Sequence, residues 1–475
     1  MRFEHRGVIE GFYGTPWSHG DRLWMIECLG RWGMNRYVYA PKNDPLNRDR
    51  WREPYPVETL RQFAELVARG DGCGVGVGFA ISPGLSICYA SREDRSALVE
   101  KLNAFTNLGA RFIALALDDV PFELAHAEDV REFGSLAAAH VELAHEVRRH
   151  LAPKVALWLV PTDYLGVEPS DYLETLGASL DPEIEVGWTG RTVVSPSIEA
   201  AEARQRSGTL RRRLLVWDNV PVSDGPMRPL LHLGPYAGRA KPLAESLSGV
   251  LLNPMEHAHA SAVAIRTASA YLADPESYDP ESAWREALAE VGEGAPEAFA
   301  LFAEAHRFSP QWLHDRDREL DAGLDALRTG LRDGTAVASE LEALQAALDV
   351  RLQASETLRE QLADRRLAEE LAPWLGSHRS ETLRMQVALR ALAKLVDADA
   401  SRMSRTFAVF GMETTLTAEP EPRCVSYGPR RIFYPQLASL REGEMGFGED
   451  PCLIRDRSLA EDFVRLVEEL ALERL

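Results

Sequence analysis

Short apolar runs alternate with longer amphipathic segments along the first half of the chain. Eight such runs occupy residues 7–12, 36–41, 75–82, 111–119, 154–161, 184–190, 213–219 and 249–254. Most segments between them have apolar residues at helical spacing and are long enough for a crossover helix between parallel strands. Strands that are buried on both faces are typically continuous apolar runs. The pattern therefore predicts an α/β fold, a (β/α)8 or TIM barrel, over residues 1–270.

The second half of the chain has a different pattern. Between about residues 271 and 399, long stretches rich in Ala, Leu, Glu and Arg contain no strand-like run, which predicts an all-α helical bundle. Residues 400–475 are mixed and end in an amphipathic helix. Glycine and proline interrupt helices, and the boundaries that they predict are Gly323, Gly330, Gly334 and Pro373.

Charge and cysteine content narrow the classes of partner and compartment. The chain has 73 acidic and 53 basic side chains, a net charge of −20, whereas nucleic acids and anionic membranes bind clustered Lys and Arg. We therefore expect neither as a partner. No apolar run reaches the roughly 18 residues of a membrane span, and the first residues contain no signal-peptide core. The five cysteines are widely spaced without a CxxC pair, so we expect a cytoplasmic protein without a disulfide framework.

Polar residues follow almost every predicted strand. Parallel strands of a barrel end at one face, where the catalytic groups of such barrels lie. Taken singly, a polar residue at such a position is more often a helix cap or a turn former. Taken together, these residues predict a polar barrel mouth, formed by 10–14, 42–44, Asp118 and Asp119, 162–164, 188–190, 217–219 with Asp224, and Asn253.

Of the predicted strand ends, the one carrying the adjacent acids Asp118 and Asp119 says most about the chemistry of the site. Both can reach the mouth only where the strand stops, because neighbouring strand side chains point to opposite faces. Two carboxylates this close disfavour double ionisation, which predicts coupled titration and one general acid. Conventional glycosidases hold their carboxylates about 5 to 9.5 Å apart, whereas in substrate-assisted catalysis the sugar's 2-acetamido oxygen is the nucleophile. Adjacent acids suit the second mechanism and indicate an N-acetylated sugar.

Several segments between Gly7 and about Pro254, a little over half of the chain, form a recognisable series: GVIEGFYGTPW, WGMNRYVYAPKNDP, ISPG, LDD, PTDY, WTG, WDN followed by SD, LGPY and LLNP. In this order they resemble glycoside hydrolase family 84, the O-GlcNAcase and hexosaminidase family. The resemblance implies a retaining β-N-acetylglucosaminidase that acts through an oxazoline intermediate without a metal or organic cofactor. Its expected partner is a GlcNAc-bearing glycoside or glycoprotein.

The resemblance also implies roles for individual residues. Asp119 would be the general acid and base, protonated at the start of the cycle, while Asp118 would orient the acetamido group and stabilise the charged intermediate. Tyr164 and Asn219 would help to position the acetamido group and Asp118, with Trp217 as the wall of the acetyl pocket. The residues implied to bind sugar hydroxyls are Gly11, through its backbone, Lys42, Asp224 and Asn253.

Other interpretations stay open at this level. A non-catalytic module that binds GlcNAc-modified proteins would hold the sugar without turnover, and an endo-acting hydrolase of a polymer such as hyaluronan would need an open cleft. The acid pair alone would also suit a solvated loop that caps the next helix. Gly225, Pro226 and Pro229 depart from the family pattern and leave the aglycone side of the pocket undetermined.

Two expectations concern the C-terminal half. The helical region is expected to mediate formation of a homodimer. The aromatic residues Tyr427, Phe433 and Tyr434 are expected to line the edge of a substrate groove. No function is predicted for the rest of residues 400–475.

Overall fold

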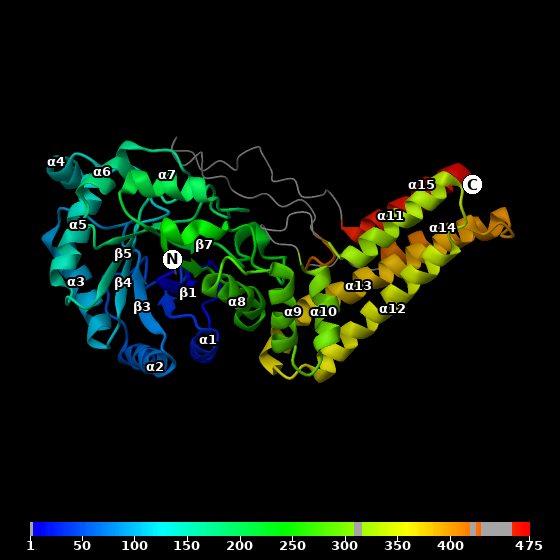
Figure 1. Cartoon of the computed structure of the whole chain (residues 1–475), viewed down its shortest axis with the longest axis horizontal. Coiled ribbons are helices and arrows are strands. Elements are labelled where there is room, and N and C mark those ends of the chain that lie inside the picture. The colour runs from blue at the N-terminus through cyan, green and yellow to red at the C-terminus, as the bar shows by residue number, and fades with distance from the viewer. Residues whose placement is uncertain (1–2, 308–315, 419–423, 429–457) are drawn as a thin grey trace.

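Eight parallel strands pair in chain order and close into a barrel (Figure 1). The computed structural model describes residues 3–307, 316–418, 424–428 and 458–475. Each strand overlaps one of the eight apolar runs, which confirms the predicted (β/α)8 barrel. The strands are β1 His5–Glu10, β2 Arg36–Tyr39, β3 Gly76–Ile81, β4 Phe112–Ala116, β5 Ala156–Val160, β6 Glu185–Trp188, β7 Leu214–Asp218 and β8 Leu247–Leu252.

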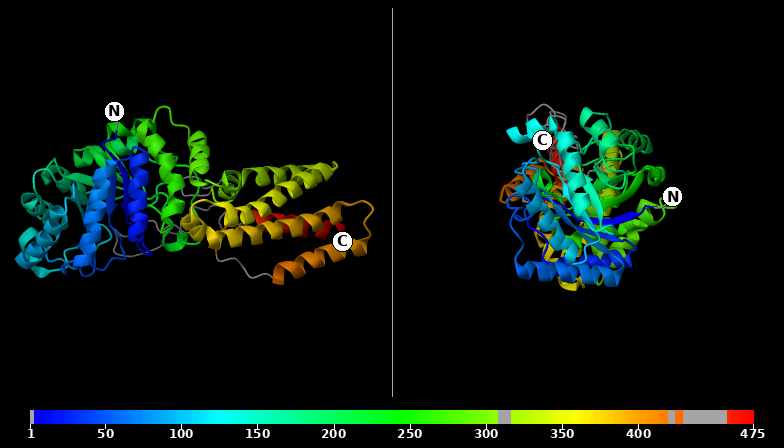
Figure 2. Two further views of the ribbon diagram at one scale, coloured as in Figure 1. Left: turned by 90° about the horizontal axis from the view of Figure 1, so that it is seen from below. Right: turned by 90° about the vertical axis from the view of Figure 1, so that its left-hand side faces the viewer.

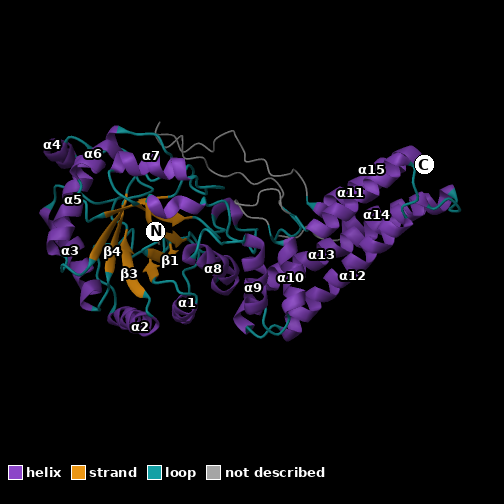
Figure 3. Cartoon of the chain, in the orientation of Figure 1, coloured by secondary structure: helices purple, strands orange, loops and turns teal. Residues whose placement is uncertain are grey.

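Helices surround the barrel on the outside (Figure 3). Four of them begin after a serine whose hydroxyl accepts a backbone N–H of the first turn, which stabilises the helix start: Ser18, Ser91, Ser135 and Ser170. The helices are α1 His19–Arg31, α2 Val57–Cys73, α3 Arg92–Asn107, α4 Ala127–Phe133, α5 Leu136–His150, α6 Asp171–Ser179, α7 Ala200–Leu210 and α8 Ala258–Ala273. Two short 3₁₀ helices, η1 Gly225–Met227 and η2 Lys241–Glu245, lie between β7 and β8.

Aromatic side chains contribute to the interior of the barrel. Phe112 of β4 stacks on Trp158 of β5 with ring centroids 4.3 Å apart. Gly78 of β3 makes room for this pair, because a Cβ atom there would lie 1.7 Å from Cε2 of Phe112. The interior of the barrel is therefore a packed core.

Beyond α8 most of the described chain is helical, and the longer helices extend away from the barrel (Figures 1 and 2). These helices are α9 Pro280–Val291, α10 Pro296–Ala305, α11 Arg318–Asp333, α12 Ala338–Gln361, α13 Arg365–Val396, α14 Arg402–Ala418 and α15 Leu459–Arg474. Phe463 and Val467 of α15 share a buried cluster with Leu324 of α11 and Leu389 of α13. Helix α15 thus belongs to the core of the bundle, and the boundaries near residues 270 and 399 stay predictions.

The predicted helix boundaries are confirmed in part. Gly334 ends α11 with a φ of 69°, the left-handed conformation that suits glycine. Gly323 and Gly330 lie inside α11, and Pro373 lies inside α13, so these three predictions are wrong. Burial of Trp374 and its neighbours between the helices stabilises α13 across the proline, which local sequence does not reveal.

The prediction that Tyr427 lines the edge of a substrate groove is wrong. This residue is fully buried in the bundle, where its hydroxyl lies 2.7 Å from the Thr382 hydroxyl and 2.8 Å from Nε2 of His378. Phe433 and Tyr434 lie outside the described residues.

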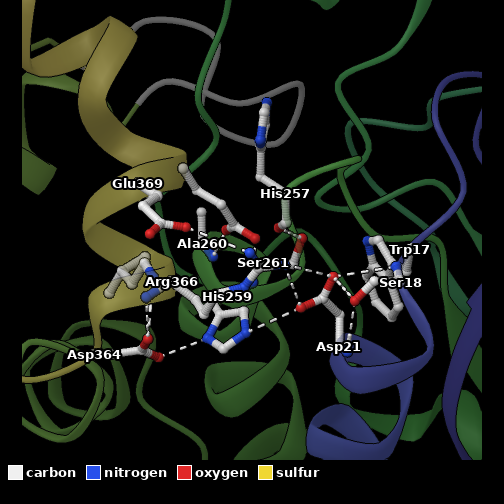
Figure 4. A network of polar contacts seen from close by, with 12 residues as sticks. Trp17, Ser18, Asp21, His257, His259, Ala260, Ser261, Asp364, Arg366 and Glu369 are labelled. Carbon is white, nitrogen blue, oxygen red and sulfur yellow. Dashed lines mark hydrogen bonds and ion pairs between the residues drawn. The ribbon is translucent and has the colours of Figure 1, made fainter.

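Polar side chains join the barrel to α13 (Figure 4). Nδ1 of His259 in α8 lies 2.6 Å from Oδ2 of Asp364, the N-cap of α13. Nε2 of the same ring lies 3.6 Å from Oδ1 of Asp21 in α1, and Arg366 of α13 pairs with Asp21 at 3.2 Å. Ionisable groups therefore connect α1, α8 and α13, and the junction should respond to pH.

The buried carboxyl group of Glu370 should make the stability of this junction depend measurably on pH. Its carboxylate accepts the N–H groups of His259 and Ala260 at 3.2 and 2.9 Å, and burial raises its pKa from 4.5 to about 7. The folded state therefore binds more protons than the unfolded state between these values, and stability declines as the pH rises through them. We expect the free energy of unfolding of the wild type to fall relative to that of Glu370→Gln over this window, by up to about 3 kcal/mol.

Chemical denaturation of both proteins at a series of pH values checks this expectation. Other titrating groups, including His259 and Asp364, are present in both proteins, so they largely cancel in the difference. Parallel stability curves for the two proteins would contradict it.

Candidate active site

The two acids after β4 lie with their carboxylates together. Lys42, which follows β2, reaches both, with Nζ 2.5 Å from Oδ2 of Asp118 and 3.5 Å from Oδ2 of Asp119. An extended backbone would point the two side chains to opposite faces. Asp119 instead has a φ of 54°, in the left-handed region, at a cost of about 1 kcal/mol. This turn at the strand end brings the carboxylates to one place.

Lys42 is a fixed positive charge beside the acid pair. It is buried, and its Nζ lies 5.4 Å from the centroid of the Trp217 ring. Burial alone would lower the pKa of Lys42, but the attraction of Asp118 and Asp119 is larger and raises it. The resemblance implies that Lys42 binds sugar hydroxyls, whereas in this structure its ammonium group contacts the acids.

Both carboxylate oxygens of Asp119 accept a tyrosine hydroxyl. Tyr164, after β5, donates to Oδ1 at 3.0 Å, and Tyr13, after β1, donates to Oδ2 at 2.8 Å. Nη1 of Arg48 donates to the hydroxyl oxygen of Tyr13 at 2.7 Å. Neither Tyr13 nor Arg48 is among the site residues that the sequence predicts. Tyr13 lies in the polar strand end 10–14, which was the available signal, whereas Arg48 lies in a loop that gave none.

The two carboxyl groups have different environments. The side chain of Asp118 is 9% exposed and that of Asp119 is 26% exposed. Burial raises the pKa of Asp118, and Lys42 offsets only part of this effect. Burial also acts to raise the pKa of Asp119, but Lys42 and the hydroxyls of Tyr13 and Tyr164 outweigh it, and the pKa is lowered.

Before a sugar binds, these contacts favour the ionised form of Asp119, whereas the prediction of a protonated Asp119 applies to the start of the cycle and stays a prediction. Asp119 has donors on both oxygens, which favour its ionised form, while Asp118 has a donor on one. The sequence could not reveal this because the donors come from the ends of three other strands.

Residues at or just beyond the ends of β1, β7 and β8 form the other part of the site. Nε1 of Trp217 and Nδ2 of Asn253 both donate to Oδ1 of Asn219, at 3.1 and 2.8 Å. The Gly11 N–H donates to Oδ1 of Asn253 at 3.1 Å, so it is already used within the protein. A Cβ atom at residue 11 would lie 2.1 Å from Cζ2 of Trp217, which explains the glycine. The structure brings these four predicted residues together.

Asp224 lies beside the segment that follows β1. Its Oδ2 accepts the N–H of Tyr13 at 2.8 Å, and burial raises its pKa although this hydrogen bond opposes the rise. On the same segment, the N–H of Thr15 donates to Oε1 of Glu256 at 3.1 Å, and Oε2 of Glu256 pairs with Arg228 at 3.2 Å. The loop that departs from the family pattern is therefore linked to the segment carrying Tyr13.

The arrangement offers a specific set of chemical groups. Oδ1 of Asp118 is buried, and none of the described residues donates a hydrogen bond to it. Such an acceptor costs roughly 1–3 kcal/mol unless a ligand supplies a donor. Asp119 is an acid or base within reach, Lys42 supplies charge, and Trp217 supplies an apolar wall. Across the described part of the chain, no three or more His, Cys, Asp or Glu residues are grouped to hold a metal ion.

Known proteins are similar to this chain in sequence and in fold. A family model described as beta-N-acetylglucosaminidase matches residues 6–304. Protein O-GlcNAcase of Rattus norvegicus is 38% identical over 267 residues, which cover 55% of this chain and 29% of that protein. A mutant O-GlcNAc hydrolase from Thermobaculum terrenum has a TM-score of 0.84 at 28% identity, covering 99% of this chain and 96% of that one. CpGH84B has a TM-score of 0.82 at 26% identity, covering 98% and 77%.

Proposed function

The chain belongs to the beta-N-acetylglucosaminidase family, and from this premise we propose that it is a retaining glycoside hydrolase that removes terminal β-linked GlcNAc. The proposed substrate is a GlcNAc-bearing glycoside or glycoprotein. The similar proteins support this substrate, since one is an O-GlcNAcase and another an O-GlcNAc hydrolase. The chain spans only 29% of the length of the rat protein, so that protein's other properties are not carried over.

The acid pair carries the proposal. Asp118 has one oxygen on Lys42 and a second, buried oxygen to which no described residue donates, and Asp119 lies next to it. We assign the free oxygen of Asp118 to the acetamido N–H of GlcNAc. A carboxylate in that place orients the acetamido oxygen toward the anomeric carbon and stabilises the positive charge that develops on the ring being formed.

The proposed reaction has two steps. In the first, the acetamido oxygen forms a bond to the anomeric carbon, the bond to the aglycone oxygen breaks, and Asp119 gives its proton to that oxygen. In the second, Asp119 takes a proton from water, which attacks the anomeric carbon and opens the oxazoline. Two displacements on one carbon restore the β configuration. Asp119 must enter protonated, which requires the bound sugar to replace at least one of its tyrosine donors.

The remaining assignments follow from position in the pocket. Tyr164 is the donor that we propose moves from Asp119 to the acetamido oxygen, and Trp217 is the wall for the acetyl methyl group. Asn219, held by Trp217 and Asn253, supports that wall. The residues proposed to bind sugar hydroxyls are Gly11, through its carbonyl oxygen, Lys42, Asp224 and Asn253.

Hydrolysis of aryl β-N-acetylglucosaminides tests the function. We expect turnover with the β anomer released first, and kcat/KM lower by more than about tenfold when the acetamide is replaced by a trifluoroacetamide, because the nucleophile is weakened. An unchanged rate would exclude the acetamido group as nucleophile. Binding of GlcNAc without any turnover would favour the non-catalytic alternative.

We also propose a homodimer through the helical region. Three apolar side chains, Met403, Phe407 and Phe410, lie exposed along α14, and Phe407 is 67% exposed. Apolar residues exposed together on one helix are typical of an interaction surface. We expect small-angle scattering to give the mass of a dimer for the wild type and of a monomer for Phe407→Glu. Val130→Glu, at an exposed apolar position on α4, is the matched control; a monomeric wild type would contradict the prediction.

The cytoplasm stays our proposal for the location. No helix in the described ranges has both the length and the apolar character needed to cross a bilayer. Four of the five cysteines lie in the described residues, Cys28, Cys73, Cys88 and Cys424, and each is a free thiol.

A further inference from the structure

Asp119 is connected to an arginine through a tyrosine. Nη1 of Arg48 donates to the hydroxyl oxygen of Tyr13 at 2.7 Å, and that hydroxyl donates to Oδ2 of Asp119 at 2.8 Å. The guanidinium group also lies 5.8 Å from the centroid of the Tyr13 ring. Arg48 has no assigned place in the substrate pocket, so this chain of hydrogen bonds needs its own explanation.

The direction of each hydrogen bond is fixed by chemistry. Arg48 carries only donors, so the tyrosine oxygen must accept from it and turn its own proton elsewhere. Tyr13 is 43% exposed, and it keeps that proton at neutral pH because partial burial and the nearby Asp119 raise its pKa to about 12. A phenol that accepts from a cation is a stronger donor. Arg48 therefore strengthens the hydrogen bond that Asp119 receives.

The backbone around Arg48 is well anchored. Nδ2 of Asn47 donates to the carbonyl oxygen of Ala80 in β3 at 2.8 Å, and the N–H of Ser82 donates to the carbonyl oxygen of Asn47 at 3.0 Å. Oδ2 of Asp44 accepts the hydroxyls of Tyr39 and Tyr55, each at 2.7 Å. The loop is thus attached to the barrel on both sides of residue 46, and Arg48 can hold Tyr13 in one place.

We propose that Arg48 is a positioning residue that acts through Tyr13 to set the orientation and the proton affinity of Asp119. This inference rests on the proposed function. Oδ2 stays bound to Tyr13 throughout the cycle, while Oδ1, which Tyr164 releases to the substrate, carries the proton to the leaving oxygen. Within the first step, Arg48 therefore contributes to protonation of the leaving oxygen and little to the attack by the acetamido oxygen.

The leaving group separates these two contributions. A phenyl β-N-acetylglucosaminide needs protonation of its oxygen, whereas a dinitrophenyl glycoside departs without it. For Arg48→Met we expect kcat/KM to fall about tenfold with the phenyl glycoside and less than about twofold with the dinitrophenyl glycoside. We also expect the alkaline limb of the kcat/KM profile to move to higher pH, because the ionised acid loses support. Arg48→Lys should recover part of the shift through its charge.

Arg52→Met is the matched control. Arg52 lies in the same loop, but its hydrogen bonds go to Ser86 and Asp94, so its loss disturbs the loop without changing the donor to Asp119. Equal losses with both glycosides for Arg48→Met, or an alkaline limb that does not move, would overturn the proposal. A wild type that hydrolyses neither glycoside would instead refute the proposed function.

Discussion

Asp119→Asn is expected to lower kcat/KM for the phenyl glycoside by about 10³-fold. The substituted side chain keeps its shape but can accept only one of the Tyr13 and Tyr164 hydroxyls in place, because its NH2 group is a donor, and it has no acidic proton to give to the leaving oxygen. The dinitrophenyl glycoside should lose far less in the first step. Steady-state kinetics with both substrates measures the difference.

Azide provides a second readout for this variant. In the proposed second step Asp119 takes a proton from water, and azide needs no such help. We therefore expect azide to accelerate turnover of the dinitrophenyl glycoside by Asp119→Asn and to yield the β-glycosyl azide. Wild-type activity in the variant, with an unfolding midpoint that matches the wild type, would show that another group is the acid.

Asp118→Asn is expected to lower kcat/KM by about 10²- to 10³-fold with both glycosides alike. The carboxylate that would orient the acetamido group and stabilise the charged intermediate becomes neutral, and this loss acts on ring formation and not on protonation of the leaving group. Asp119 keeps its tyrosine donors in this variant, so the two acids are separated by their dependence on the leaving group.

The acetamide series completes the test of Asp118. Because the variant no longer aligns the nucleophile, we expect its kcat/KM to depend less steeply on fluorination of the acetamide than that of the wild type. A loss confined to the phenyl glycoside would assign Asp118 to proton transfer instead. Thermal unfolding of both proteins is needed alongside, because Asp118 pairs with the buried Lys42.

Much of the barrel could be predicted from the sequence. Strands buried on both faces consist of continuous apolar runs, such as the run that precedes Asp118. Serines such as Ser18 and Ser170 mark the starts of helices. The helical region was less predictable. Pro373 lies inside α13, because burial of Trp374 and its neighbours outweighs a local interruption. The packing of α15 in the bundle depends on contacts distant in sequence.

The candidate site was predicted unevenly for a similar reason. Asp118 and Asp119 stand out because two acids end an apolar run, and that signal is local. Tyr13 was only weakly indicated by its place in a polar strand end, and nothing in the sequence indicated Arg48. An arginine in a polar loop is common, and its role becomes visible only in the structure, where Nη1 of Arg48 lies 2.7 Å from the Tyr13 hydroxyl oxygen.

The sequence by itself determined that eight strands form a barrel, roughly where they lie, and which polar residues follow them at one face. The periodicity of side chains and the chemistry of adjacent carboxylates are sufficient for that. The tertiary structure alone decided that Lys42 contacts the acids, that Asp119 turns at a φ of 54° and that Tyr13 and Tyr164 both bind it. These features depend on distances between the ends of different strands. Such distances set proton affinity and orientation, and they exist only once the barrel has closed.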